Sequence, residues 1–227
     1  MAKIGIVCSS AGGAFHTAQA LLTNCGFHHN YFVVTDRQCG IEEKCCELSI
    51  PVKRIIDADK SSFSKKASYW LFEEMQVDWV CLFFSRVIGP ELFERGLCVN
   101  IHPSLLPEFP GMGAVRKALE HKSKFLGCTA HIVDATIDGG PILSQTCARI
   151  LQDITFDAAQ KLSFVQKVYL FLLLAERSDS DQMIASFIDS GSKVANHPNN
   201  YNLNLINVSL KKAFKRFLVN EGVNLCL

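Results

Sequence analysis

Short apolar runs alternate with longer helical patterns over most of the chain, from Lys3 to Ile150. The runs are apolar throughout, which is typical of strands buried on both faces. Strands of this kind, separated by helices, form a mostly parallel sheet with helices on both faces. The pattern therefore predicts a doubly wound α/β fold of Rossmann type, which binds ligands at the carboxyl ends of its strands. The expected strands are Lys3–Cys8, Tyr31–Thr35, Val52–Ile56, Val77–Phe84 and Leu97–His102.

The pattern changes after these five strands. Thr129–Asp134 and Ile142–Ile150 are predicted to be two further strands, on either side of the glycine turn Asp138–Pro141. The expected helices carry apolar residues three to four positions apart. They are Ala14–Asn24, Ser61–Met75, Thr155–Ala175, Gln182–Ser190 and Val208–Val219.

The chain is expected to divide near residue 190. Residues 1–190 are predicted to form one domain, and residues 191–227 a loop followed by a C-terminal helical extension of unknown role. The segment Asn196–Asn207 is rich in asparagine and contains Pro198, which favours a loop. The helix that follows it is basic and amphipathic. It either packs on the domain or binds a partner, and the sequence leaves both open.

Composition narrows the class of protein. In 227 residues, 23 basic side chains nearly balance 22 acidic ones, which argues against nucleic-acid and membrane-surface binding. No apolar run approaches the roughly 20 residues that cross a bilayer, and the N-terminus lacks the pattern of a signal peptide. The 10 cysteines include no CxxC pair, so we expect reduced thiols, no metal site and a cytoplasmic protein.

The first candidate for chemistry is the turn Ser9–Ala14, between the first strand and the first helix. Free backbone N–H groups at such a helix start, together with the helix dipole, favour a phosphate or a carboxylate. Gly12, Gly13 and Ala14 would supply these groups. The alternative is a tight strand-to-helix turn that uses glycine only for its backbone conformation.

The second candidate is the end of the fifth strand. Asn100 and His102 are two residues apart, so they share a face where this fold places its ligands. An amide can donate a hydrogen bond, and an imidazole can gain or lose a proton near neutral pH. Pro103 and Pro107 are expected to stiffen the loop that follows.

The third candidate is Asp138, which precedes Gly139 and Gly140. Two glycines let the chain turn back closely and could bring the carboxylate to His102. A carboxylate there would raise the pKa of the imidazole and stabilise its charged form. The alternative is an ordinary hairpin turn, for which Asp-Gly is a common dipeptide.

Together these residues resemble the formyltransferases that use 10-formyltetrahydrofolate. The most specific parts are Asn100–Pro107, followed by Pro110-Gly111, and Ile137–Pro141. The resemblance extends over Lys3–Ile150 and faintly to Ala175, and within the family it favours the branch that formylates phosphoribosylglycinamide in purine biosynthesis. It implies a formyltransferase fold for residues 1–190.

The resemblance also implies roles for individual residues. In the catalytic trio, Asn100 would donate to the oxyanion, His102 would handle protons and Asp138 would orient His102. No metal is implied. The residues implied for the folate are Arg86, Val87, Ile88, Asp134 and Gly139. For Arg86 three roles stay open: it contacts the acid tail of the folate, it frames the pocket, or it forms a surface salt bridge. The residues implied for the acceptor are Gly12, Gly13, Ala14, Lys66 and Gln166.

The acceptor side departs from the family pattern. Gly13-Ala14 replaces Ser-Asn, Lys66 stands where an arginine is usual, and Gln166 where a glutamate is usual. His131 is retained, either lining the site or as an ordinary strand histidine. These departures indicate either a changed acceptor or sequence drift that leaves the backbone N–H groups in use.

The expected function is transfer of a formyl group from 10-formyltetrahydrofolate to the amine of phosphoribosylglycinamide. The alternatives are a related formyltransferase with another amine acceptor, a hydrolase of the same folate, and a folate-binding protein without activity. The expected partner is a small-molecule amine, which the family resemblance implies to be phosphorylated, and neither a nucleic acid nor a membrane is expected. A homodimer is left open.

Overall fold

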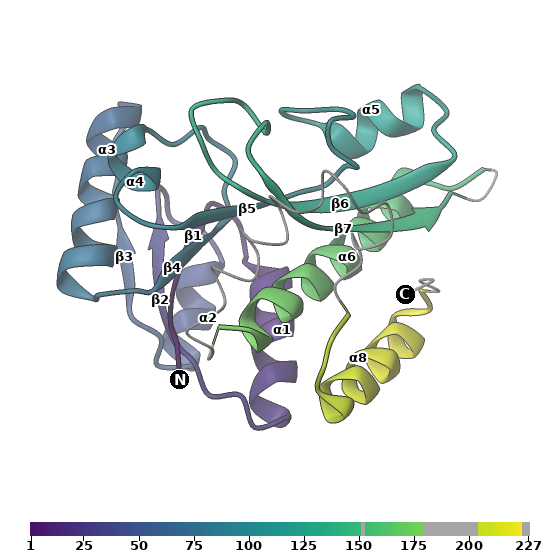
Figure 1. Cartoon of the computed structure of the whole chain (residues 1–227), viewed down its shortest axis with the longest axis horizontal. Coiled ribbons are helices and arrows are strands. Elements are labelled where there is room, and N and C mark those ends of the chain that lie inside the picture. The colour runs from purple at the N-terminus through teal and green to yellow at the C-terminus, as the bar shows by residue number, and fades with distance from the viewer. Residues whose placement is uncertain (151–152, 179–203, 224–227) are drawn as a thin grey trace.

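The computed structural model describes residues 1–150, 153–178 and 204–223. Its centre is a seven-stranded sheet in the order β3-β2-β1-β4-β5-β6-β7 (Figure 1). The strands are β1 (Lys3–Cys8), β2 (Asn30–Thr35), β3 (Val52–Arg54), β4 (Trp79–Phe83), β5 (Cys98–His102), β6 (Phe125–Ile132) and β7 (Ile142–Arg149).

The first five strands are parallel to one another, and β6 is antiparallel to both of its neighbours, β5 and β7. Chain order reverses at β1, which lies between β2 and β4. The register of β5 with β6 places Asn100 opposite His131 and His102 opposite Thr129. The doubly wound, mostly parallel sheet predicted from the sequence is confirmed.

Helices cover both faces of the sheet. A large core on one face includes residues of α1 (Gly13–Asn24), α2 (Ile41–Glu47), α5 (Ala114–Glu120), α6 (Phe156–Glu176) and α8 (Val208–Glu221). A second core on the other face includes residues of α3 (Lys60–Ser68), the π-helix η1 (Tyr69–Glu74) and α4 (Pro90–Phe93). This layering leaves the carboxyl ends of the parallel strands free to hold a site.

Helix α6 is the central helix of the larger core. Its N-terminus is capped by Thr155, whose hydroxyl accepts a hydrogen bond from the backbone N–H of Ala158. Its apolar run, Val168–Ala175, is buried along its whole length. Phe214 of α8 packs on Tyr169 of α6, with ring centroids 5.1 Å apart. In the part of the chain that the structure describes, no helix is both long and apolar enough to span a membrane.

Several elements differ from the sequence prediction. The expected helix Ser61–Met75 is split into α3 and η1, and β6 begins at Phe125 rather than Thr129. Helices α2, α4 and α5 were not predicted. The expected helix Gln182–Ser190 and most of the loop Asn196–Asn207 lie outside the described residues. The helix Val208–Val219 is found, and it packs on the domain, while the boundary near residue 190 stays a prediction.

Candidate active site

A cavity with a volume of about 810 Å³ lies at the carboxyl ends of the parallel strands. Its walls come from the turn after β1, the loops after β4 and β5, the β6–β7 loop and one face of α6. Asn100, His102 and Asp138 all line it. The cavity therefore lies where the fold class predicts a ligand site.

The predicted trio comes together in this cavity. The amide Nδ2 of Asn100 donates to Asp138 Oδ1 over 3.2 Å. His102 Nδ1 lies 3.3 Å from Asp138 Oδ2. Asp138 has φ 51°, a left-handed conformation that turns the chain back toward β5. The carboxylate thus joins two side chains that the strand period had already placed on one face.

Two further groups hold the Asp138 carboxylate. The backbone N–H of Gly111 donates to Oδ2 over 2.7 Å, and His131 Nε2 lies 3.5 Å from Oδ1. His131 Nε2 is also 3.2 Å from Asn100 Nδ2, so His131 lines the site. The hydrogen bond with His131 is the main cause that lowers the pKa of Asp138, to about 2, against the opposing effect of burial. Asp138 is therefore a carboxylate at neutral pH.

His102 is almost fully buried, and its two nitrogens face different groups. Nε2 is 3.0 Å from the carbonyl of Phe109, to which it can only donate. In the neutral ring the lone pair is then on Nδ1, beside Asp138. Burial lowers the pKa of His102, while the Phe109 carbonyl and the Asp138 charge raise it. Asp138 does raise the pKa of His102, as expected, but the net pKa is lowered because the effect of desolvation is larger.

The glycine turn after β1 also lines the cavity, through Gly12, Gly13 and Ala14. Gly12 is the N-cap of α1 at φ 68°. A Cβ on it would lie 2.8 Å from Ile41 Cδ1, so both backbone and space require glycine here. A Cβ on Gly13 would lie 3.4 Å from Phe164 Cε2. The turn therefore presents its backbone to the cavity, with an aromatic ring of α6 beside it.

Four of the five residues implied for the folate line the cavity: Arg86, Val87, Ile88 and Asp134. The Arg86 guanidinium donates to the carbonyls of Asp57 and Ala58, over 2.9 and 3.0 Å, and lies 3.4 Å from Asp36 Oδ2. These bonds hold it in the frame of the pocket.

Gly139 is the fifth, and it does not line the cavity. A Cβ on Gly139 would lie 2.5 Å from Thr136 Oγ1. The close approach of these two residues requires glycine and shapes the loop that carries Asp138.

Lys66 and Gln166, which the resemblance implies for the acceptor, are not among the residues that line this cavity. Lys66 does not line the cavity, because its ammonium is bound to Asp57 over 2.7 Å. Gln166 is fully buried under α6, where its amide donates to the carbonyl of Leu126. Their assignment to the acceptor stays a prediction.

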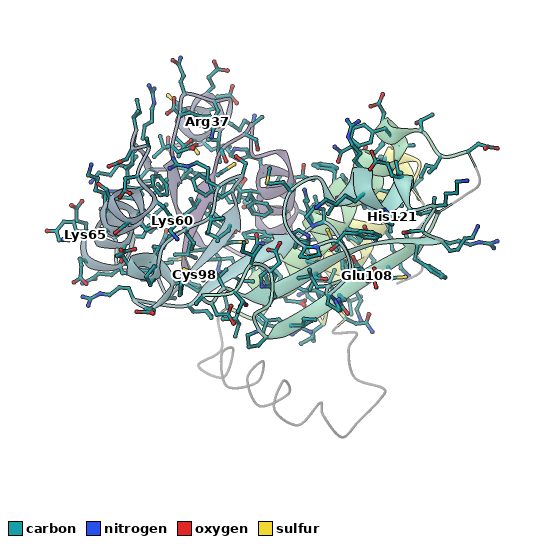
Figure 2. The ribbon with its side chains drawn as sticks, turned by 90° about the horizontal axis from the view of Figure 1, so that it is seen from above. Arg37, Lys60, Lys65, Cys98, Glu108 and His121 are labelled. Carbon is teal, nitrogen blue, oxygen red and sulfur yellow. The ribbon has the colours of Figure 1, made fainter. Side chains whose placement is uncertain are left out.

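Other residues of the same helices face the cavity instead. On α3 the lining residue is Lys60. Figure 2 shows Lys60 nearer the centre of the molecule, whereas Lys65 lies at its outer edge. On α6 they are Gln160, Phe164 and Lys167, at the i, i+4, i+7 spacing of one helix face. That spacing is visible in the sequence, but the sequence does not say which face of the helix meets the ligand.

Nine of the ten cysteines lie in the described residues, and five of these are buried: Cys8, Cys45, Cys81, Cys98 and Cys128. Burial raises the pKa of Cys45 to about 12, and that of Cys128 to about 11, which makes these thiols poor nucleophiles. Within the described ranges, no group of three His, Cys, Asp or Glu side chains has an arrangement that could hold a metal ion.

Comparison with known proteins agrees with this geometry. Residues 3–170 match the family model described as formyl transferase. A phosphoribosylglycinamide formyltransferase of Mycobacterium tuberculosis is 38% identical over 126 residues, covering 52% of this chain and 58% of that relative. The trifunctional purine biosynthetic protein adenosine-3 of Drosophila melanogaster is 46% identical over 81 residues, covering 34% of this chain and 6% of that protein. The chain thus spans less than two thirds of the length of these relatives.

Solved structures show the same fold. The glycinamide ribonucleotide transformylase 1 of Symbiobacterium toebii has a TM-score of 0.71 at 26% identity, covering 78% of this chain and 88% of that one. The phosphoribosylglycinamide formyltransferase of Streptococcus pneumoniae has a TM-score of 0.67 at 26% identity, covering 83% of this chain and 99% of that one.

Proposed function

Because the chain belongs to the formyl transferase family, we propose that it transfers a formyl group from 10-formyltetrahydrofolate to the amine of phosphoribosylglycinamide. The observation that carries the proposal is the meeting of Asn100, His102 and Asp138 in one cavity of about 810 Å³. An amide, an imidazole and a carboxylate together supply an oxyanion donor, a proton acceptor and a group that stabilises the charged acceptor.

The reaction joins the acceptor nitrogen to the formyl carbon and breaks the bond from that carbon to the folate nitrogen. As the amine attacks, the formyl oxygen gains negative charge, and Asn100 Nδ2 donates to it. One such donor contributes about 3 kcal/mol to transition-state stabilisation. For this step Nδ2 must exchange its bond with Asp138, or share its second hydrogen.

His102 moves the proton that the amine loses. With Nε2–H held by the Phe109 carbonyl, Nδ1 is the atom free to accept it. The imidazolium so formed is stabilised by Asp138, whose low pKa keeps it charged throughout. The proton then passes to the folate nitrogen as it leaves, and neutral His102 is restored.

The cavity divides into two halves around this trio. We assign the folate to the half formed by the loop after β4 and the β6–β7 loop, where Val87, Ile88 and Asp134 lie. We call the other half the acceptor half; it is lined by Gly12–Ala14, Met112, Gly113, Phe164 and Lys167. Arg86 is already held by three protein oxygens. We therefore assign the acidic tail of the folate to Lys60, which lies at the start of α3 and lines the cavity.

The test is formylation by the purified chain of phosphoribosylglycinamide, with 10-formyltetrahydrofolate as donor. We expect a formylated product, and a loss of about 100-fold or more in kcat for Asn100→Ala. Folate binding by the variant, measured separately, shows whether the pocket is intact. Formate release that does not depend on an acceptor would indicate the hydrolase instead.

One observation favours testing other amines as well. The acceptor half lacks the polar side chains of the usual family pattern, since Gly13, Ala14 and Phe164 present only backbone and apolar groups there. A panel of phosphorylated and unphosphorylated amines, run beside phosphoribosylglycinamide, distinguishes a changed acceptor from the proposed one. Transfer to another amine alone would move the chain to a different branch of its family.

A further inference from the structure

The acceptor half contains a lysine with no counter-charge in the protein. Lys167 lies on α6, lines the cavity and is half-buried. Among the residues that the structure describes, none gives its ammonium a hydrogen bond or an ion pair. Lys161, on the same helix, is bound to Glu221 of α8 over 3.1 Å. A half-buried cation that has lost hydration without gaining a partner favours an anion brought by a ligand.

The other charges of the cavity lie elsewhere. Its carboxylates are Asp138 at the centre, and Asp134 and Glu94 in the folate half. Of the acceptor-half residues described in the structure, none is a carboxylate. This half therefore has a positive potential, which disfavours an ammonium and favours a phosphate or a carboxylate.

Residues of α6 close to Lys167 contact both the glycine turn and the strand beside the reaction centre. Phe164, one turn earlier on the same face, packs at Gly13. Ser163 accepts a hydrogen bond from Cys128, whose neighbour Thr129 lies opposite His102.

The electrostatics agree with this placement. Burial lowers the pKa of His102 and raises that of Cys128, and in both cases the charge of Lys167 acts to lower the pKa. A cation that acts on both groups lies near His102 at the end of β5 and near Cys128 in the middle of β6.

We propose that Lys167 binds an anionic group of the acceptor, and so selects anionic amines over neutral or cationic ones. The inference rests on the proposed function, because it assigns a ligand group to the acceptor half of that site. Phosphate and carboxylate share the required chemistry, and the experiment separates them.

The experiment compares the full-length protein with Lys167→Met, Lys167→Arg and the control Lys161→Met. Inorganic phosphate and acetate are titrated separately, and dissociation constants are obtained from NMR shifts of backbone amides near the site. We expect Lys167→Met to weaken binding about 10- to 100-fold, Lys167→Arg to restore most of it and Lys161→Met to leave it unchanged. Tighter phosphate binding indicates a phosphorylated acceptor, and tighter acetate binding a carboxylated one.

Two results would overturn the inference. One is that the wild-type protein binds neither anion, and the other is that Lys167→Met binds both as tightly as wild type. Failure of the proposed function looks different: phosphoribosylglycinamide is not formylated, yet anion binding still depends on Lys167. If both proposals hold, Lys167→Met raises the KM of the acceptor and leaves the KM of the folate unchanged.

Discussion

Asp138 shows how one side chain can organise a site. Its two oxygens contact Asn100, His102, His131 and the backbone of Gly111. Asn100, His131 and the Gly111 backbone form hydrogen bonds with it, so the carboxylate is stabilised in its charged form. Asn100 and His102 in turn are held at fixed positions before any substrate binds, which reduces the reorganisation that the reaction requires.

Replacing Asp138 therefore tests the electrostatics of the trio. In Asp138→Asn, His102 loses the charge that raises its pKa, so the pKa should fall further below its ordinary value. We expect kcat to fall by about 100-fold or more, and the NMR titration of His102 to move to lower pH. Asp134→Asn is the matched control on the same loop. An unchanged titration of His102 in Asp138→Asn would contradict this account.

His16 provides a test of how a buried imidazole without a hydrogen-bond partner affects stability. Both of its ring nitrogens are buried and have no hydrogen bond among the described residues. Burial lowers its pKa to about 4. In the unfolded chain the pKa is near 6.5, so between these values the unfolded state binds more protons and stability falls as pH falls. We expect a loss of up to about 3 kcal/mol from pH 7 to pH 4.

Urea unfolding at a series of pH values measures this loss. His16→Leu should remove most of the pH dependence over that range, whereas His28→Gln, at an exposed position, should retain it. Equal pH dependence in wild type and His16→Leu would show that other groups cause the loss.

The position of a site residue was predictable from the sequence where it depends only on its immediate neighbours in the chain. Asn100 and His102 follow from the period of a strand, and Asp138 from a turn that only glycines allow to close. The sequence did not show that Lys66 and Gln166 lie away from the cavity lining, because the direction of a helical side chain depends on how the helix is rotated in the fold. That rotation is set by packing across the sheet, which is a property of distant residues.

At the level of elements, the strands were predicted best because their apolar runs are buried on both faces. Helices α2, α4 and α5 were missed because they are short and their packing, rather than a long apolar period, makes them helical. The expected helix Ser61–Met75 is divided because η1 changes the hydrogen-bond pattern at Tyr69, which no residue there signals.

Helix α8 offers a prediction at this scale. Phe214 is 1% exposed and packs on Tyr169, so Phe214→Ala should lower the free energy of unfolding by about 3–5 kcal/mol. Val219 is 78% exposed on the same helix, and Val219→Ala should change the free energy of unfolding by less than about 0.5 kcal/mol. Urea denaturation measures both. A small effect of Phe214→Ala would mean that α8 is loosely attached in solution.

For the molecule as a whole, the question is whether the C-terminal segment is a separate appendage. Helix α8 adds Leu210, Phe214 and Leu218 to the same core that includes α1 and α6. The walls of the cavity depend on that core, because Phe164 and Lys167 project from α6. The fold and the site are therefore expected to lose stability together if α8 is removed.

A chain ending at residue 190 tests this expectation. Burial of three large apolar side chains contributes about 5–9 kcal/mol, which is comparable to the whole stability of an ordinary domain. We expect the shortened chain to be unfolded or to lose its sharp urea transition, and to bind no folate. A chain ending at Val223 keeps α8 and is the control. If the shortened chain unfolds as cooperatively as the control, residues 1–190 fold independently and the division near residue 190 is correct.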